Sequence, residues 1–207
     1  MNKAKLSYLP LLFTLCLFSI TLFECSGQDD SEFRQKIEAF VNDHANDYEK
    51  RTLNLADRDL GAIDQIDNKW KEEFQLRSLD KEENNLGYNK KAKYYFSFFV
   101  YETKTDRQYA LKDWLEHFIN DQEIRVSRPV RTYKYATPTI ILINDTQIIT
   151  CNYKCSDYSE QNFKDWRKKL LTYFGEENTM VIEVLCDGPL EWTKNAPDPK
   201  TSRREMP

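Results

Sequence analysis

Residues 93–102 read KYYFSFFVYE, and six of these ten residues are aromatic. Aromatic and β-branched side chains are typical of β-strands, so this stretch predicts a strand. It also marks a change along the chain. The residues before it show helical spacing and then a charged loop over 78–91, whereas the residues after it alternate between strand and helix patterns. The sheet of the fold is therefore expected to begin here.

Two amphipathic helices are predicted before this strand. Over residues 31–50, apolar side chains recur at spacings of three and four, which is the period of a helix, and Ser31 offers an N-cap. A second helix is predicted over 63–77. Its apolar face consists of Ile63, Ile66, Trp70 and Phe74.

Two more helices and four more strands are predicted after residue 102. The helices are 107–119, which Thr105 or Asp106 can cap, and 160–174. The strands are 123–130, 139–143, 147–153 and 180–186. The two middle strands form a hairpin. Its turn, Asn144-Asp145-Thr146, is also the only N-glycosylation sequon of the chain, although a turn that favours Asn and Asp is sufficient to explain it.

Together these elements predict a single α+β domain over residues 28–192. Two N-terminal helices precede a mixed sheet of four or five strands, and the helices at 107–119 and 160–174 pack on that sheet. The tail over 193–207 is polar and contains spaced prolines, which predicts disorder.

A weak internal repeat runs through the second half of the chain. Tyr101 and Trp114 line up with Tyr153 and Trp166 at one fixed offset, and each copy reads as strand, polar loop and helix. A true repeat implies two strand–helix–strand units that share one sheet, with both tryptophans on the same face. Few identities support the alignment, so chance is the alternative.

The first 27 residues have the pattern of an export signal. Lys3 and Lys5 give a positive start, residues 6–23 are almost wholly apolar and uncharged, and small residues follow at the exit. Residues 1–27 are therefore predicted to be a signal peptide, which makes the mature protein secreted or periplasmic.

Three states of this N-terminus stay open. Cleavage before Gln28 is favoured, because Cys25 and Gly27 stand three and one residues before the cut. A bacterial lipoprotein is the second state, in which Cys25 carries a lipid, although Glu24 departs from the small residue that such signals have at that position. An uncleaved anchor is the third. Contact with a membrane is expected only through a lipidated or uncleaved N-terminus.

The composition argues against several kinds of partner and chemistry. The chain has a net charge of −4, which disfavours nucleic acid as a partner. It contains no glycine-flanked nucleophile, nucleotide-binding motif or HExxH pattern. Its two histidines, His44 and His117, are too few and too far apart in sequence for a metal site. No catalytic residue, cofactor or metal is therefore predicted, and a non-enzymatic role is favoured.

The mature chain keeps three cysteines, which are Cys151, Cys155 and Cys186. An exported protein meets an oxidising compartment, which allows one disulfide among them. On one continuous strand Cys151 and Cys155 would lie roughly 13 Å apart, too far for a bond. A structural bridge from Cys151 or Cys155 to Cys186 is therefore favoured. A reactive thiol pair is the functional alternative.

The segment Thr137-Pro138-Thr139 carries a family resemblance. A proline that leads into an apolar strand, a tight hairpin and a final amphipathic helix resembles the C-terminal half of a thioredoxin fold. The resemblance implies a cis proline that shapes a binding groove. Residues 104–107 (KTDR) stand where that family has its CxxC motif, which implies a redox-inactive relative. The alternative is a proline that only begins an edge strand.

One segment is cationic within an acidic chain. Over residues 125–135 it carries Arg125, Arg128, Arg131 and Lys134. Together with Pro138, these residues are candidate contacts for a protein partner or another anionic surface. The alternative is a twisted edge strand whose charges prevent aggregation.

As a whole, the sequence predicts an exported, non-enzymatic binding or interaction protein. One alternative is a redox-inactive thioredoxin-like protein, or a thiol-dependent enzyme that uses the Pro138 groove with Cys151 or Cys155. Another alternative is an exported inhibitor or immunity protein. The partner is expected to be a protein, but no residue identifies it.

Overall fold

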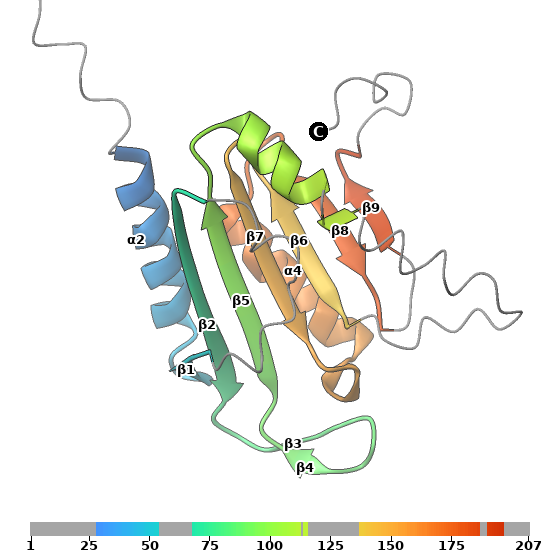
Figure 1. Ribbon diagram of the computed structural model, residues 1–207. Helices are drawn as coiled ribbons and strands as arrows, with labels where there is room; N and C mark the ends of the chain where they lie inside the picture. The colour runs from blue at the N-terminus through green and yellow to red at the C-terminus, as the bar shows by residue number, and fades with distance from the viewer. Residues whose placement is uncertain (1–27, 54–67, 113, 116–136, 187–189, 197–207) are drawn as a thin grey trace, which may run out of the picture. The chain divides into compact units, whose positions relative to one another are not determined.

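The computed structural model describes residues 28–53, 68–112, 114–115, 137–186 and 190–196 (Figure 1). The chain separates into two units, residues 1–39 and 40–207. In the first unit α2 (Gln28–Asp43) begins, and the side chains of Phe33 and Ile37 are buried. Their spacing of four residues agrees with the helical period predicted from residue 31. The helix ends earlier than predicted, because the residues up to 50 include the start of a strand.

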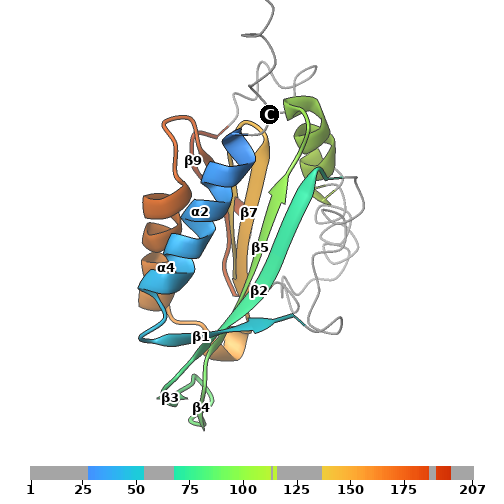
Figure 2. The ribbon, with the colours of Figure 1, turned by 90° about the vertical axis from the view of Figure 1, so that its left-hand side faces the viewer.

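Within its described residues, the second unit is built on a seven-stranded sheet (Figures 1 and 2). From edge to edge its strands are β1 (Tyr48–Thr52), β2 (Trp70–Ser78), β5 (Lys93–Val100), β7 (Gln147–Tyr153), β6 (Thr139–Ile143), β8 (Met180–Val184) and β9 (Leu190–Lys194). A small second sheet pairs β3 (Glu82–Glu83) with β4 (Asn89–Lys90). Each of these pairings is antiparallel.

The expectation of two N-terminal helices followed by a mixed sheet of four or five strands is therefore wrong. Residues 70–77 of the predicted second helix lie in β2, while residues 63–67 lie outside the described part of the chain. The spacing of Trp70 and Phe74 misled the prediction. Residues four apart share one face of a helix, but they also share one face of a strand, whose period is two.

The later strands follow the sequence more closely. The predicted hairpin strands appear as β6 and β7 with the expected bounds, and the last predicted strand appears as β8, which ends at Val184. The predicted strand over 123–130 lies outside the described residues. β9 continues to Lys194, so regular structure includes residues 193 and 194, the first two residues of the predicted disordered tail.

One face of the sheet is covered by α4 (Glu160–Phe174), which has the bounds predicted from the sequence (Figure 2). The hydroxyl oxygen of Ser159 accepts a hydrogen bond from the Asn162 N–H, which caps the helix. The buried side chains of α4 are Phe163, Trp166, Leu170 and Phe174. The Trp166 ring centre lies 4.7 Å from that of Tyr94 on β5, so an aromatic layer joins the helix to the strand.

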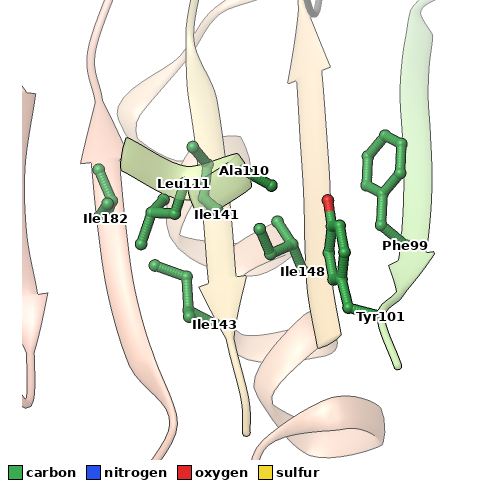
Figure 3. Packing of buried hydrophobic residues seen from close by; sticks show 8 residues of the cluster. All are labelled: Phe99, Tyr101, Ala110, Leu111, Ile141, Ile143, Ile148 and Ile182. Carbon is green, nitrogen blue, oxygen red and sulfur yellow. The ribbon is translucent and has the colours of Figure 1, made fainter. Parts of the chain in front are cut away.

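The opposite face is covered by a helix over residues 104–112 (Figures 1 and 2). Thr103 caps this helix, since its hydroxyl accepts from the Asp106 N–H at 3.1 Å and donates to the Asp106 carboxylate at 2.7 Å. The helix therefore begins before residue 107, and its cap is neither Thr105 nor Asp106. Figure 3 shows Ala110 and Leu111 lying over the isoleucine side chains of the sheet.

The two tryptophans of the suggested repeat lie on opposite faces of the sheet. Trp114 packs against the cluster that contains Tyr101 and Leu111, whereas Trp166 lies in the aromatic layer with Tyr94. Tyr153 also contacts Tyr94, at 5.2 Å between ring centres. The expectation that both copies place their tryptophan on one face is wrong.

The fold implied by the thioredoxin resemblance is also wrong. Strand–helix–strand crossovers of that kind require parallel neighbouring strands, and every described pairing is antiparallel. The described residues contain no cis peptide bond, so Pro138 is trans. The edge-strand alternative is also wrong, because β6 lies between β7 and β8. The KTDR segment is the first turn of the 104–112 helix.

The aromatic layer leads to a stability prediction. Phe98 is fully buried, and its ring centre lies 5.5 Å from that of Phe74 and 5.2 Å from that of Phe174. We expect Phe98→Ala to lower the free energy of unfolding by about 3–5 kcal/mol in urea titrations, because the cavity cannot collapse. Tyr109→Ala is the control, since Tyr109 is exposed and a change within about 0.5 kcal/mol is expected there. Equal losses in the two variants would contradict this assignment of the core.

Candidate functional site

A hairpin built on β3 and β4 projects beyond the end of β2 and β5 (Figure 1). We call residues 79–91 the arm. The sequence predicted this segment as a plain loop, so the paired strands are an addition. Its apolar side chains are exposed, at 66% for Leu86, 67% for Tyr88 and 42% for Leu79. Among the described residues, the other large apolar side chain that is exposed is Tyr109. Exposed apolar surface is thus concentrated on the arm.

Hydrogen bonds to one asparagine fix the tip of the arm. The Asn84 side-chain oxygen accepts from the backbone N–H of Leu86 at 3.0 Å and of Tyr88 at 2.8 Å. The Asn84 N–H donates to the Tyr88 carbonyl at 3.0 Å. Gly87 has a φ of +77°, in the left-handed region that glycine adopts without strain. The two apolar side chains are therefore presented by a defined turn.

The arm is attached to the 3₁₀ helix η3 (Cys155–Asp157). The backbone N–H of Asn85 donates to the Ser156 carbonyl at 3.1 Å, and its side-chain amide donates to the Tyr158 carbonyl at 2.5 Å. Lys90 Nζ lies 2.6 Å from the Asp157 carboxylate, whose side chain is only 5% exposed. Because the Asp157 carboxylate is shielded from water, salt screens its attraction to Lys90 less than that of an exposed pair. These contacts hold the arm in one orientation.

A disulfide holds η3 in turn. Cys155 is bonded to Cys186, which follows β8, and their Cα atoms lie 5.3 Å apart. Of the two bridges favoured by the sequence, the structure therefore contains the one from Cys155. The bridge ties the segment after β7, to which the arm is attached, to the end of β8, and β6 lies between these two strands in the sheet.

The third cysteine lies in the core. Cys151 is a free thiol on β7, fully buried, with Phe96 and Ile140 as its neighbours on the adjacent strands. Burial raises the pKa of this thiol above its ordinary value. A thiol in such surroundings is chemically inert, so the geometry gives no support to a reactive thiol pair.

Of the partner-binding residues predicted from the sequence, the structure describes only Pro138. Arg125, Arg128, Arg131 and Lys134 lie outside the described residues, as does the lipidation candidate Cys25. Pro138 is described and is buried, with its carbonyl accepting a hydrogen bond from the Tyr153 N–H at 3.2 Å. Its side chain is therefore not part of an exposed groove.

The sequon at the hairpin turn is also explained by the structure. The Asn144 side chain is buried, and its amide donates to the Phe174 carbonyl at 3.0 Å at the end of α4. Its oxygen accepts from the Thr179 hydroxyl at 2.7 Å. Asn144 therefore serves as a tie between β6 and α4, which explains an asparagine at this turn without glycosylation.

The arm was missed by sequence reasoning because its charged residues outnumber its apolar ones. A signal was nevertheless present. Leu86 and Tyr88 are isolated apolar residues on either side of Gly87, and Asn84-Asn85 comes just before them. Asparagine and glycine at this spacing indicate a tight turn, and apolar side chains within such a turn have no core to enter.

Comparisons with protein-family models, with curated proteins and with solved structures find no match to the chain. In the described part of the chain, no helix has the length and apolar character needed to cross a membrane. The same residues contain no group of three or more His, Cys, Asp and Glu side chains placed to hold a metal ion.

The disulfide should control the order of the arm. It closes a loop of 31 residues, for which chain entropy gives about 4 kcal/mol. We expect the double variant Cys155→Ser/Cys186→Ser to lose stability of that order in urea titrations. The Asn85 amide, which donates to the Ser156 carbonyl, should exchange with deuterium faster in this variant than in the unaltered protein, when both rates are divided by those of the β5 amides. Cys151→Ala is the control that keeps the bridge, and it should leave this ratio unchanged. Unchanged Asn85 protection in the double variant would show that the bridge does not order the arm.

The buried thiol gives a second test. We expect iodoacetamide at mildly alkaline pH to leave Cys151 unmodified in the folded protein and to modify it after unfolding, as peptide mass mapping will report. Because its folded pKa lies above the ordinary value of 9.0, burial contributes stability that is complete below that pH. This contribution is lost as the pH rises toward the folded pKa. Rapid modification of Cys151 in the native state would contradict its burial.

Proposed function

We propose that this chain is an exported, non-enzymatic interaction protein that binds a partner protein through the arm. The observation that carries the proposal is the exposure of Leu86 and Tyr88, at 66% and 67%, on a turn fixed by hydrogen bonds. An export route is supported by the Cys155–Cys186 disulfide, since structural disulfides persist in oxidising compartments.

The rigidity of the arm is what separates it from an ordinary surface loop. Association has to overcome the entropy lost when loops and side chains become ordered. Here the tip is already ordered by Asn84, and the hairpin is already attached to η3 through Asn85 and Lys90. A partner that buries Leu86 and Tyr88 would therefore gain apolar contact with little further ordering. Tyrosine is also enriched among the residues that dominate binding energies.

The arm indicates the chemistry of the partner surface. Two apolar side chains on a narrow tip fit a pocket lined with apolar groups. Glu82 and Glu83 are exposed on β3, and the Glu83 carboxylate lies within about 4 Å of the position that a Cβ at Gly87 would take. A carboxylate beside the tip favours lysine or arginine side chains at the rim of that pocket. The cationic segment at residues 125–134 stays a separate prediction.

The test places a photo-reactive phenylalanine analogue at position 88 of the full chain, expressed and exported in its native cells. We expect illumination to link position 88 to one discrete protein and Leu86→Ser to remove that product. The matched control carries the same analogue at position 109, because Tyr109 is also exposed but lies on the 104–112 helix. It should give no such product.

Two results would overturn the proposal. One is a probe at position 88 that yields no discrete product or the same products as the probe at position 109. The other is a product that consists of two copies of this chain, since that would assign the arm to self-association. Circular dichroism of the purified Leu86→Ser variant should match the unaltered protein, because the Leu86 side chain is largely exposed.

A further inference from the structure

A hollow of about 460 Å³ lies between the outer side of α4 and the segment over residues 43–48, which joins α2 to β1. It lies apart from the tip of the arm. Its volume is within the range of about 300–1,000 Å³ that is typical of small-molecule sites. The proposed protein-binding role of the arm does not use this hollow.

Aromatic rings form one wall of the hollow. His44, Tyr48 and Tyr173 line it, and the ring centre of His44 lies 6.4 Å from that of Tyr48 and 6.1 Å from that of Tyr173. The rings are held in place by the core. Tyr48 packs on Trp166 at 5.3 Å, and His44 Nδ1 is 2.6 Å from the Phe40 carbonyl, to which it donates in the tautomer that the contact requires. The wall is thus held in place, although its rings are tilted, by 51° between His44 and Tyr48 and by 57° between His44 and Tyr173.

Polar side chains of both signs surround this wall. Asp43 and Asp165 contribute carboxylates, and Lys168 and Lys169 contribute ammonium groups. Lys169 Nζ lies over the Tyr48 ring at 5.6 Å and over the Trp166 ring at 4.5 Å, so one donor covers part of the aromatic surface. The hollow therefore offers donors and acceptors in similar number, and its formal charges cancel.

The equal number of carboxylates and ammonium groups favours some classes of ligand over others. A phosphate or another strong anion is recognised by an excess of arginine or lysine over carboxylates, which is not present here. A purely apolar ligand would displace water from both lysines and both carboxylates, and each carboxylate keeps only one hydrogen bond from the protein, Asp43 from the Tyr173 hydroxyl and Asp165 from the Gln161 amide. A neutral polyhydroxylated ring fits both features, because each hydroxyl donates and accepts, and the C–H face of the ring packs on aromatic side chains.

The geometry points to a saccharide site, in which one or two neutral sugar units pack against the rings of Tyr48 and Tyr173, which the buried His44 separates. Their hydroxyls then donate to Asp43 and Asp165 and accept from Lys168 and Lys169. The site requires no metal and no chemical step. It would give the exported chain a second binding surface that recognises glycan.

The test is a binding titration of the purified chain, followed by NMR. The neutral probes are cellobiose, maltose, lactose and di-N-acetylchitobiose, and the charged probes are glucuronic acid and glucosamine. We expect saturable binding of at least one neutral disaccharide at millimolar concentrations or below. The ring signals of Tyr48 and Tyr173 should shift, whereas the backbone signals of Tyr88 on the arm should not. The charged monosaccharides should bind more weakly.

Matched variants on α4 separate the site from non-specific binding. Asp165→Ala with Lys168→Ala removes one acceptor and one donor from exposed positions, so the fold should persist and the affinity should fall at least tenfold. Lys164→Ala is the control, because Lys164 is equally exposed on the same helix but does not line the hollow. Saturable binding by none of the four disaccharides, equal affinity in all variants, or tighter binding of a charged sugar would each overturn the assignment.

Discussion

The structure depends on the burial of both faces of one strand. β5 pairs with β2 on one side and β7 on the other, and every residue from Tyr94 to Val100 is buried. Tyr94, Phe96 and Phe98 enter the aromatic layer with α4, while Phe99 and the following Tyr101 enter the cluster beneath the 104–112 helix. Because successive side chains of a strand point to opposite faces, a single aromatic run can supply both layers. The two helices can then cover the sheet without contacting each other.

A segment could be predicted correctly where its residue pattern fits only one type of secondary structure. The bounds of α4 follow from Ser159 at its start, Gly175 at its end and apolar residues at helical spacing between them. β2 could not be predicted in this way, since the positions of Trp70 and Phe74 satisfy both a helix and a strand, and only pairing with β5 decides between them. Sheet order is equally hidden, because it depends on contacts between segments far apart in sequence.

The candidate sites were harder to predict than the fold, for two different reasons. The arm depends on its attachment to η3 through Asn85 and Lys90, and neither contact has a sequence signature. The hollow is assembled from residues 43–48 and from α4, segments that are distant in sequence. By contrast, a disulfide to Cys186 was predicted from three cysteines and strand geometry, and the structure selects Cys155 as its partner.

The two proposed surfaces share a structural origin. The side-chain amide of Asn162, in the first turn of α4, donates to the Tyr94 hydroxyl of β5. Asn162 lines the 460 Å³ hollow and also a smaller hollow of about 80 Å³ beneath the arm. Burial raises the pKa of Tyr94 to about 12, so this hydroxyl stays protonated across the physiological range and the contact does not change with pH. The aromatic strand that organises the core therefore also positions the start of α4, and with it a side chain that lines both hollows. A defect in the core would disturb both surfaces together, whereas an exposed substitution on one surface leaves the other intact, which is why the two roles can be separated by experiment.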